Sequence, residues 1–209
     1  MNSASRLSAA SRMTPAGGLT PVSAFLKIAE DADYAFLLES VEGGEHVGRY
    51  SFLGKDPFLI LTAKDGRTVI ERAGATVESD RPFIDTLRSL MADYRSPFVP
   101  DLPRFTGGAV GYLGYGAATW FEPVLGDLGE SADGADHAGF MLFDTVLAFD
   151  HVQHRILIIA NARITADDDL ESLYQFACAK IQFVERELER SLSQVRRERR
   201  SFFRRARAG

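Results

Sequence analysis

The sequence predicts an α+β protein with mainly antiparallel β-sheet and flanking helices. Short apolar runs typical of strands follow one another at hairpin spacing, separated by polar turns, two of which contain glycine. Helical patterns occur only at intervals, whereas a parallel α/β protein would place a helix after almost every strand. Together these two observations favour antiparallel sheet over a doubly wound α/β fold.

Two hairpins are predicted in the N-terminal half. The run YAFLLESV at residues 34–41 is nearly continuous in apolar residues, as in a strand buried on both faces, and residues 48–53 return after a Glu-Gly-Gly-Glu turn. Residues 58–63 and 68–72 form the second hairpin, because the Asp65-Gly66 pair between them strongly favours a turn. Further strands are expected at residues 140–149 and 155–161, on either side of a turn.

Three helices are predicted. Thr20 is expected to cap a short helix over residues 22–29, with Pro21 at the first helical position. Residues 82–94 are amphipathic, and a longer apolar stripe runs from residue 167 to about residue 197. One side chain from each of five predicted sheet segments is expected in the core: Leu37, Phe52, Val110, Leu147 and Ile158.

Composition and charge divide the chain into three parts. Residues 1–18 are rich in serine, alanine and glycine and are predicted to be disordered, residues 19–188 form the domain, and residues 189–209 form a basic helical tail. Eight arginines against one glutamate give the last twenty residues a charge of +7, although the whole chain has a net charge of -5. The acidic body gives no reason to expect nucleic-acid binding.

The remaining composition points to a reducing compartment. Cys178 is the one cysteine, so an internal disulfide is excluded and a cytoplasmic location is expected. No stretch reaches the ~20 apolar residues that a membrane-spanning helix needs.

The residues alone do not predict a catalytic or metal site. Gly107, Gly108, Gly111 and Gly114 fit neither a phosphate-binding loop nor the dinucleotide fingerprint, so their interpretation is structural, as bends and close backbone approaches in a sheet. The histidines have no neighbouring carboxylates or thiols at metal-ligand spacing, and no Ser-His-Asp or Cys-His arrangement can be argued.

One constellation leaves two interpretations open. Glu39 and Ser40 end an apolar run, where polar groups are costly to bury, and Arg49 follows on the next strand. The three could hold a zwitterion, with the carboxylate facing an ammonium group and the guanidinium facing a carboxylate. Alternatively, Glu39 and Arg49 form a cross-strand pair and Ser40 starts the turn.

Several ordered segments resemble the N-terminal domain of anthranilate synthase component I. They are TPVSAFL (residues 20–26), FLLESVEGGEHVGRYSFLG (36–54) and FTGGAVGYLGY (105–115). Shorter matches in the right order are Asp56-Pro57, Phe121-Glu122 and FDTVLAFDH (143–151). The resemblance covers residues 18 to about 188, and the paired LLES and GRYSFLG motifs are its most specific part. It implies sandwich-like antiparallel sheets with flanking helices.

The resemblance also implies a function. The family enzyme converts chorismate and ammonia to anthranilate and pyruvate with magnesium, and a glutamine amidotransferase component II supplies the ammonia. Chorismate, magnesium and the catalytic groups belong to the family's C-terminal domain, so this chain is expected to have no cofactor and to be inactive alone. The N-terminal domain contributes to a feedback site for L-tryptophan, which by position implicates Ser40 first, then Glu39 and Leu38, and more weakly Arg49.

Three other interpretations stay open at this point. The related aminodeoxychorismate synthase component I shares the domain. The arginine-rich ending is unlike the family's continuation, which is consistent with a truncated or frameshifted reading frame. The chain could also be a free-standing amino-acid-binding or interaction module.

Overall fold

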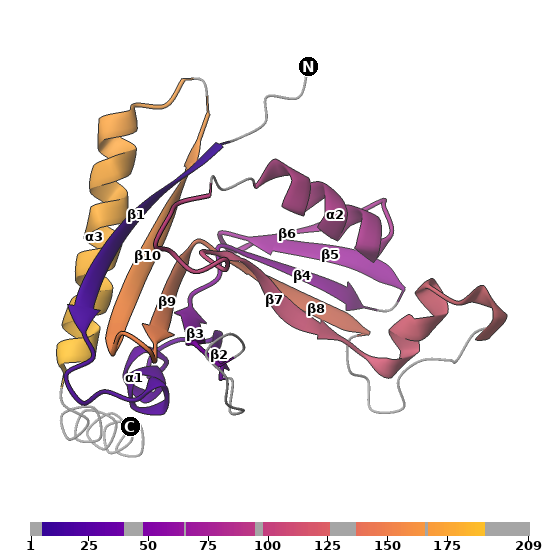
Figure 1. The fold of residues 1–209 in the computed structure, drawn as a ribbon. Coiled ribbons are helices and arrows are strands. Elements are labelled where there is room, and N and C mark those ends of the chain that lie inside the picture. The colour runs from indigo at the N-terminus through magenta and orange to yellow at the C-terminus, as the bar shows by residue number, and fades with distance from the viewer. Residues whose placement is uncertain are drawn as a thin grey trace, which may run out of the picture.

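The computed structural model describes residues 6–39, 48–64, 66–94, 98–125, 137–165 and 167–190, and these form two antiparallel five-stranded sheets (Figure 1). The first sheet contains, in spatial order, β1 (Arg6–Pro15), β10 (Arg155–Ile164), β9 (Thr145–Asp150), β3 (Tyr50–Lys55) and β2 (Ala35–Leu38). The second contains β6 (Ala75–Ser79), β5 (Arg67–Arg72), β4 (Leu59–Lys64), β8 (Ala138–Phe143) and β7 (Gly108–Leu113). The predicted α+β class with antiparallel sheets is confirmed.

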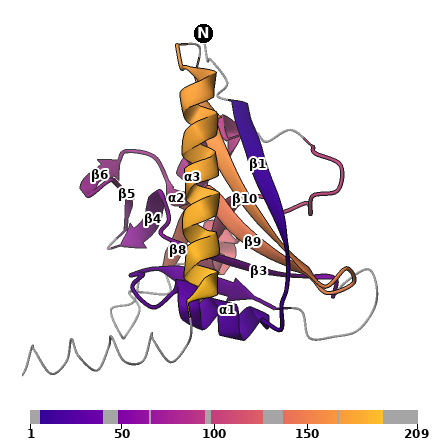
Figure 2. The same ribbon diagram turned by 90° about the vertical axis from the view of Figure 1, so that its left-hand side faces the viewer.

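Two helices cover the outer face of the first sheet. Helix α3 (Leu170–Glu189) lies across that face, with α1 (Pro21–Ile28) at its end (Figure 2). The buried side of α3 packs against β9 and β10, which burial of apolar area stabilises. The interlocking residues are Ala177, Ile181, Val184 and Leu188 of the helix and Leu147, Ile156 and Ile158 of the strands.

Helix α1 begins as the sequence predicts. The Thr20 hydroxyl accepts a hydrogen bond from the Ser23 amide at 3.1 Å, and the Ser23 hydroxyl accepts one from the Thr20 amide at 2.9 Å. This reciprocal pair satisfies two amides that the first helical turn would otherwise leave unbonded. Helix α2 (Phe83–Asp93) covers the second sheet, and short 3-10 turns η1 (Tyr115–Trp120) and η2 (Pro123–Leu125) follow β7.

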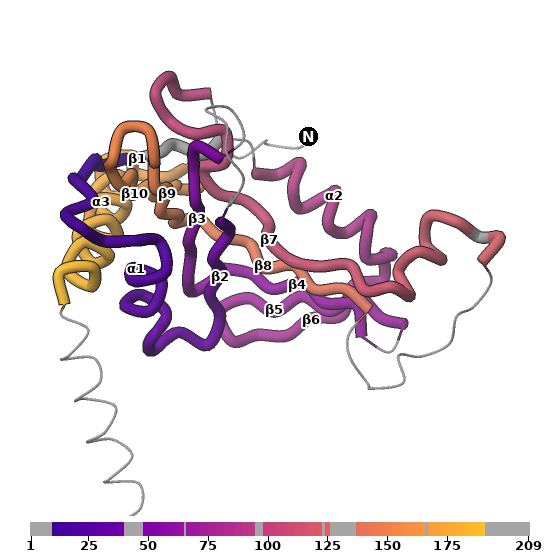
Figure 3. Tube along the Cα trace, turned by 60° about the horizontal axis from the view of Figure 1, so that its bottom comes forward, coloured from indigo at the N-terminus to yellow at the C-terminus, as the bar shows by residue number. Residues whose placement is uncertain are grey.

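The two sheets are joined where β3 leads into β4 and where β8 leads into β9 (Figure 3). Aromatic rings from both sheets meet there. The Phe36 ring lies edge-on to Phe143 at 4.8 Å between centroids, and Phe52 lies edge-on to Phe105 at 5.3 Å. These contacts fix the two sheets against each other.

The predicted core residues lie in the core. Leu147 and Ile158 are buried, and Leu37, Phe52 and Val110 are partly buried and pack against the buried clusters. No helix among the described residues is long and apolar enough to cross a membrane.

Two expectations about the strands of the first sheet are wrong. The disorder predicted for residues 1–18 does not hold for Arg6–Pro15, which forms β1 and pairs with β10 over ten residues. Backbone hydrogen bonds hold this edge strand, so it needs no apolar pattern. The strand predicted over residues 34–41 is not buried on both faces, since β2 ends at Leu38, whose side chain is 48% exposed.

Two further differences concern strand and helix boundaries. The single strand expected over residues 140–149 divides at Asp144 into β8 and β9, which belong to different sheets. Helix α3 begins at Leu170 and ends at Glu189, where Arg190 leaves the helical conformation. The predicted basic tail lies outside the described residues beyond Arg190.

Candidate functional site

Three of the predicted effector residues, Leu38, Glu39 and Arg49, lie at one end of the β2–β3 hairpin. Leu38 is the last residue of β2 and pairs with Phe52 of β3, and Glu39 follows it with an exposed side chain. Ser40 lies outside the described residues. Arg49 directly precedes β3, so the hairpin brings it to the same end as Leu38.

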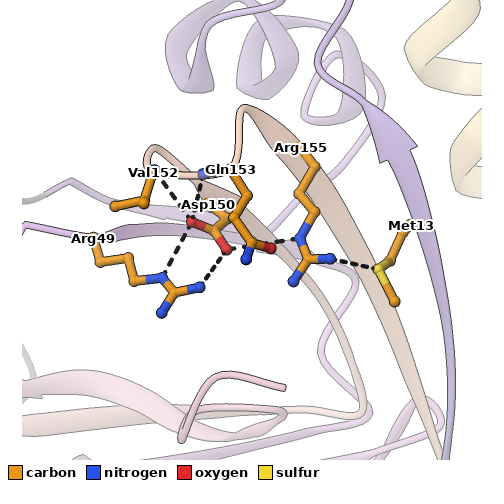
Figure 4. A network of polar contacts seen from close by, with 6 residues as sticks. All are labelled: Met13, Arg49, Asp150, Val152, Gln153 and Arg155. Carbon is orange, nitrogen blue, oxygen red and sulfur yellow. Dashed lines mark hydrogen bonds and ion pairs between the residues drawn. The ribbon is translucent and has the colours of Figure 1, made fainter. Parts of the chain in front are cut away.

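Arg49 makes its ion pair with a residue that sequence reasoning missed. Its Nε and one terminal nitrogen donate to the two carboxylate oxygens of Asp150 at 3.2 and 2.8 Å (Figure 4). The guanidinium also lies 4.9 Å from the ring centroid of Tyr50. The alternative in which Arg49 pairs with Glu39 is therefore wrong. The reason is topological, because β9 lies beside β3 and ends at Asp150.

Asp150 is the centre of the polar network drawn in Figure 4. Only 2% of the residue is exposed, and its carboxylate also accepts hydrogen bonds from the amides of Val152 and Gln153 at 3.2 and 3.1 Å. Arg155 Nε lies 3.7 Å from the same carboxylate. An aspartate that accepts from the amides two and three residues further on stabilises a turn, so its place at the start of the β9–β10 turn was the available indication.

Asp150 carries its charge in the folded protein. Burial works against ionisation of this carboxyl group, but the hydrogen bonds from Arg49 and from the turn amides outweigh burial. The pKa of Asp150 consequently lies below its ordinary value. Burial also raises the pKa of the neighbouring Tyr50, with the Asp150 charge acting in the same direction.

A serine–histidine contact ties the same end of the sheet together. The buried Ser51 hydroxyl lies 2.8 Å from His151 Nε2, and the His151 amide donates to the Arg49 carbonyl at 2.9 Å. Among the described residues no carboxylate bonds the other ring nitrogen of His151, so the pair does not make a nucleophilic triad. Its role is to hold β3 against the turn after β9.

The candidate site therefore combines an ion pair with exposed residues at the end of β2. Arg49 is held by Asp150, whereas Leu38 and Glu39 are exposed at the same end of the β2–β3 hairpin. No three histidine, cysteine, aspartate or glutamate side chains within the described ranges are placed to hold a metal ion.

The fold is of a known class. The structure is similar to the crystal structure of anthranilate synthase component I from Streptococcus pneumoniae TIGR4, with a TM-score of 0.50 and 24% sequence identity. The match covers 85% of this chain and 38% of that one. At this identity the likeness concerns the fold.

Sequence comparison identifies the relatives more closely. The chain is 38% identical over 166 residues to anthranilate synthase component 1 of Acetivibrio thermocellus, a match that covers 79% of this chain and 33% of the relative. It is 38% identical over 162 residues to the protein of that name from Synechocystis sp., covering 77% and 32%. The probable anthranilate synthase component 1 of Schizosaccharomyces pombe is 37% identical over 166 residues, covering 79% and 31%.

The chain is homologous to the N-terminal third of anthranilate synthase component I. It spans about a third of the length of the curated relatives it matches. No protein-family model matches it.

Proposed function

We propose that this chain is the tryptophan-feedback regulatory part of an anthranilate synthase component I, and that L-tryptophan binds at the end of β2 around Ser40. The observation that carries the proposal is the position of the LLES motif in a chain homologous to these proteins. β2 pairs with β3 only as far as Leu38, so Glu39 lies outside the sheet. The exposed Glu39 carboxylate is therefore available to a ligand.

Each residue has a distinct role in this proposal. The Ser40 hydroxyl bonds the polar end of the amino acid, and the Glu39 carboxylate faces its ammonium group. Leu38 supplies exposed apolar surface against the indole ring. Arg49 contributes least, because Asp150 already neutralises much of its charge and fixes two of its nitrogens.

The proposal extends to the longer protein that the relatives represent. It places the chain in tryptophan biosynthesis, in the cytoplasm. Chorismate conversion, magnesium and the glutamine amidotransferase component II are proposed only for an assembly that includes the region equivalent to the other two thirds of the relatives.

Calorimetric titration of the 209-residue chain with amino acids tests the effector site. L-tryptophan is expected to bind more tightly than L-phenylalanine, because the larger indole buries more apolar area. Ser40→Ala should weaken tryptophan binding roughly fivefold, the equivalent of about 1 kcal/mol for one hydrogen bond.

Ser89→Ala is the matched control, because Ser89 lies in α2 on the other sheet. It should leave tryptophan affinity unchanged. Equal affinities for tryptophan in the Ser40→Ala and wild-type chains, or tighter binding of phenylalanine, would refute the assignment of the effector.

A further inference from the structure

A second potential site lies beside the other sheet. A cavity of about 440 Å³ opens next to α2, and its walls come from β5, β8, β10 and the chain leading into β7. Its volume falls within the range of about 300–1,000 Å³ that is usual for small-molecule sites. The apolar part of the wall comprises Pro57, Phe58, Met91, Tyr94, Leu142 and Phe143.

The charge in the cavity wall is positive. Arg72, at the end of β5, and Arg163, in β10, both contribute to the lining. The Arg163 guanidinium lies 5.5 Å from the ring centroid of Tyr94, which positions it over an aromatic wall. Asp144 is the one acidic lining residue, and its carboxylate is held by Lys180 Nζ at 2.6 Å and by the Thr145 hydroxyl at 2.9 Å.

The glycine pair Gly107-Gly108 shapes the remaining wall. Both residues have positive φ, +157° and +137°, which side chains rarely adopt. A Cβ on Gly107 would lie 2.7 Å from Asn161 Nδ2, and that amide donates to the Thr106 carbonyl at 2.6 Å. A Cβ on Gly108 would contact the side chains of Phe105 at 3.6 Å and Met91 at 3.8 Å, so the glycine keeps the space between them open.

We propose that this cavity binds a small aromatic carboxylate. The ring would lie among Phe58, Met91 and Leu142, and the carboxylate would meet the guanidinium groups of Arg72 and Arg163. Arginine suits this task because its planar fork matches the two oxygens of a carboxylate. The site is separate from the proposed tryptophan site. Its lining includes none of Leu38, Glu39 and Arg49.

Titration of the 209-residue chain with 3-phenylpropanoate, followed by amide NMR, tests the proposal. Saturable shifts are expected at Gly108, Asn161 and Arg163. The uncharged 3-phenylpropanamide should bind at least tenfold more weakly, because it cannot make the two charge-assisted contacts. The double variant Arg72→Gln, Arg163→Gln should bind 3-phenylpropanoate at least tenfold more weakly than the wild-type chain does. Its affinity for 3-phenylpropanamide should be almost unchanged.

Two variants make the test specific. Met91→Trp should abolish binding of both probes by filling the cavity, and since Met91 is 39% exposed the larger ring can be accommodated. Arg67→Gln, on the same strand as Arg72, removes an exposed pair with Glu78 outside the cavity and should leave binding unchanged.

Equal binding of carboxylate and amide would overturn the proposal, as would the absence of saturable shifts around the cavity at millimolar probe. Neither outcome bears on the proposed tryptophan site, which is tested separately at the amides of Leu38 and Glu39. Failure of the tryptophan titration would likewise leave the 3-phenylpropanoate result intact.

Discussion

Asp150→Asn is expected to destabilise the protein by about 2–4 kcal/mol. The substitution keeps the shape of the side chain but replaces a carboxylate oxygen with an amide that cannot accept from Arg49. Arg49 loses one of its two carboxylate acceptors. Arg155, whose Nε lies 3.7 Å from the same carboxylate, loses a nearby negative charge. For a domain of this size the melting temperature should fall by roughly 5–15 °C, which thermal unfolding followed by circular dichroism measures.

Asp85→Asn is the matched control. Asp85 also pairs with an arginine, Arg88, at 2.7 Å, but both side chains are exposed on α2. Its loss should cost at most about 0.5 kcal/mol, because solvent screens such pairs. If the two variants melt within a degree or so of each other, the buried network does not hold the end of the first sheet.

The contribution of Asp150 should also depend on pH. Its pKa is lower in the folded protein than in the unfolded chain, so ionised Asp150 favours folding at every pH above the unfolded value of about 3.9. As pH falls below that value toward the folded pKa, the contribution is lost. The difference in stability between wild type and Asp150→Asn should therefore be constant near neutral pH and shrink below pH about 4.

The second large effect is expected at Gly111. A Cβ at this position would lie 2.0 Å from the Gly139 carbonyl oxygen and 2.6 Å from the Cα of Phe140, both backbone atoms of the neighbouring strand. Backbone cannot rotate away as a side chain can, so β7 would have to separate from β8. Gly111→Ala should cost about 3 kcal/mol or more, at or above the upper end for overpacking.

Gly139→Ala provides the comparison on the partner strand. Its new Cβ would come within 3.1 Å of the Tyr112 ring, but that side chain is 53% exposed and can move. The expected cost is below about 1 kcal/mol. Urea unfolding measures the free energy of unfolding of both variants. If Gly111→Ala were as stable as Gly139→Ala, β7 would not approach β8 as closely at Gly111 as the structure shows.

Local chemistry in the sequence was enough to place the hairpins and the first helix. The Asp65-Gly66 turn predicted the β4–β5 pair, and Thr20 with Pro21 predicted the start of α1. β6 went unpredicted because four of its five residues are exposed and no apolar alternation marks the strand. Only Asp144 and Thr145 interrupt the apolar run of residues 140–149, and two polar residues do not by themselves predict that the chain changes sheets there.

The candidate site was only partly predictable for the same reason. The sequence interpretations gave Arg49 either the carboxylate of a ligand or that of Glu39, ten residues away, as its partner. The partner, Asp150, lies 101 positions along the chain and arrives through the pairing of β3 with β9. Local patterns do not reveal such a pairing. The glycine segment was interpreted correctly as structural at Gly111, whereas its part in the cavity depends on α2 and β10.

The most direct test of the regulatory proposal is amide chemical-shift mapping of the 209-residue chain with L-tryptophan. Saturable shifts are expected at Leu38, Glu39 and Ser40, smaller shifts at Arg49 and Tyr50, and none in β5 or β6 at the edge of the second sheet. D-tryptophan should shift the same amides much less at equal concentration, since it cannot present ammonium, carboxylate and indole together to the same three groups. If saturating L-tryptophan leaves the amide shifts of residues 38–40 unchanged, L-tryptophan does not bind at the end of β2 and the regulatory proposal is contradicted.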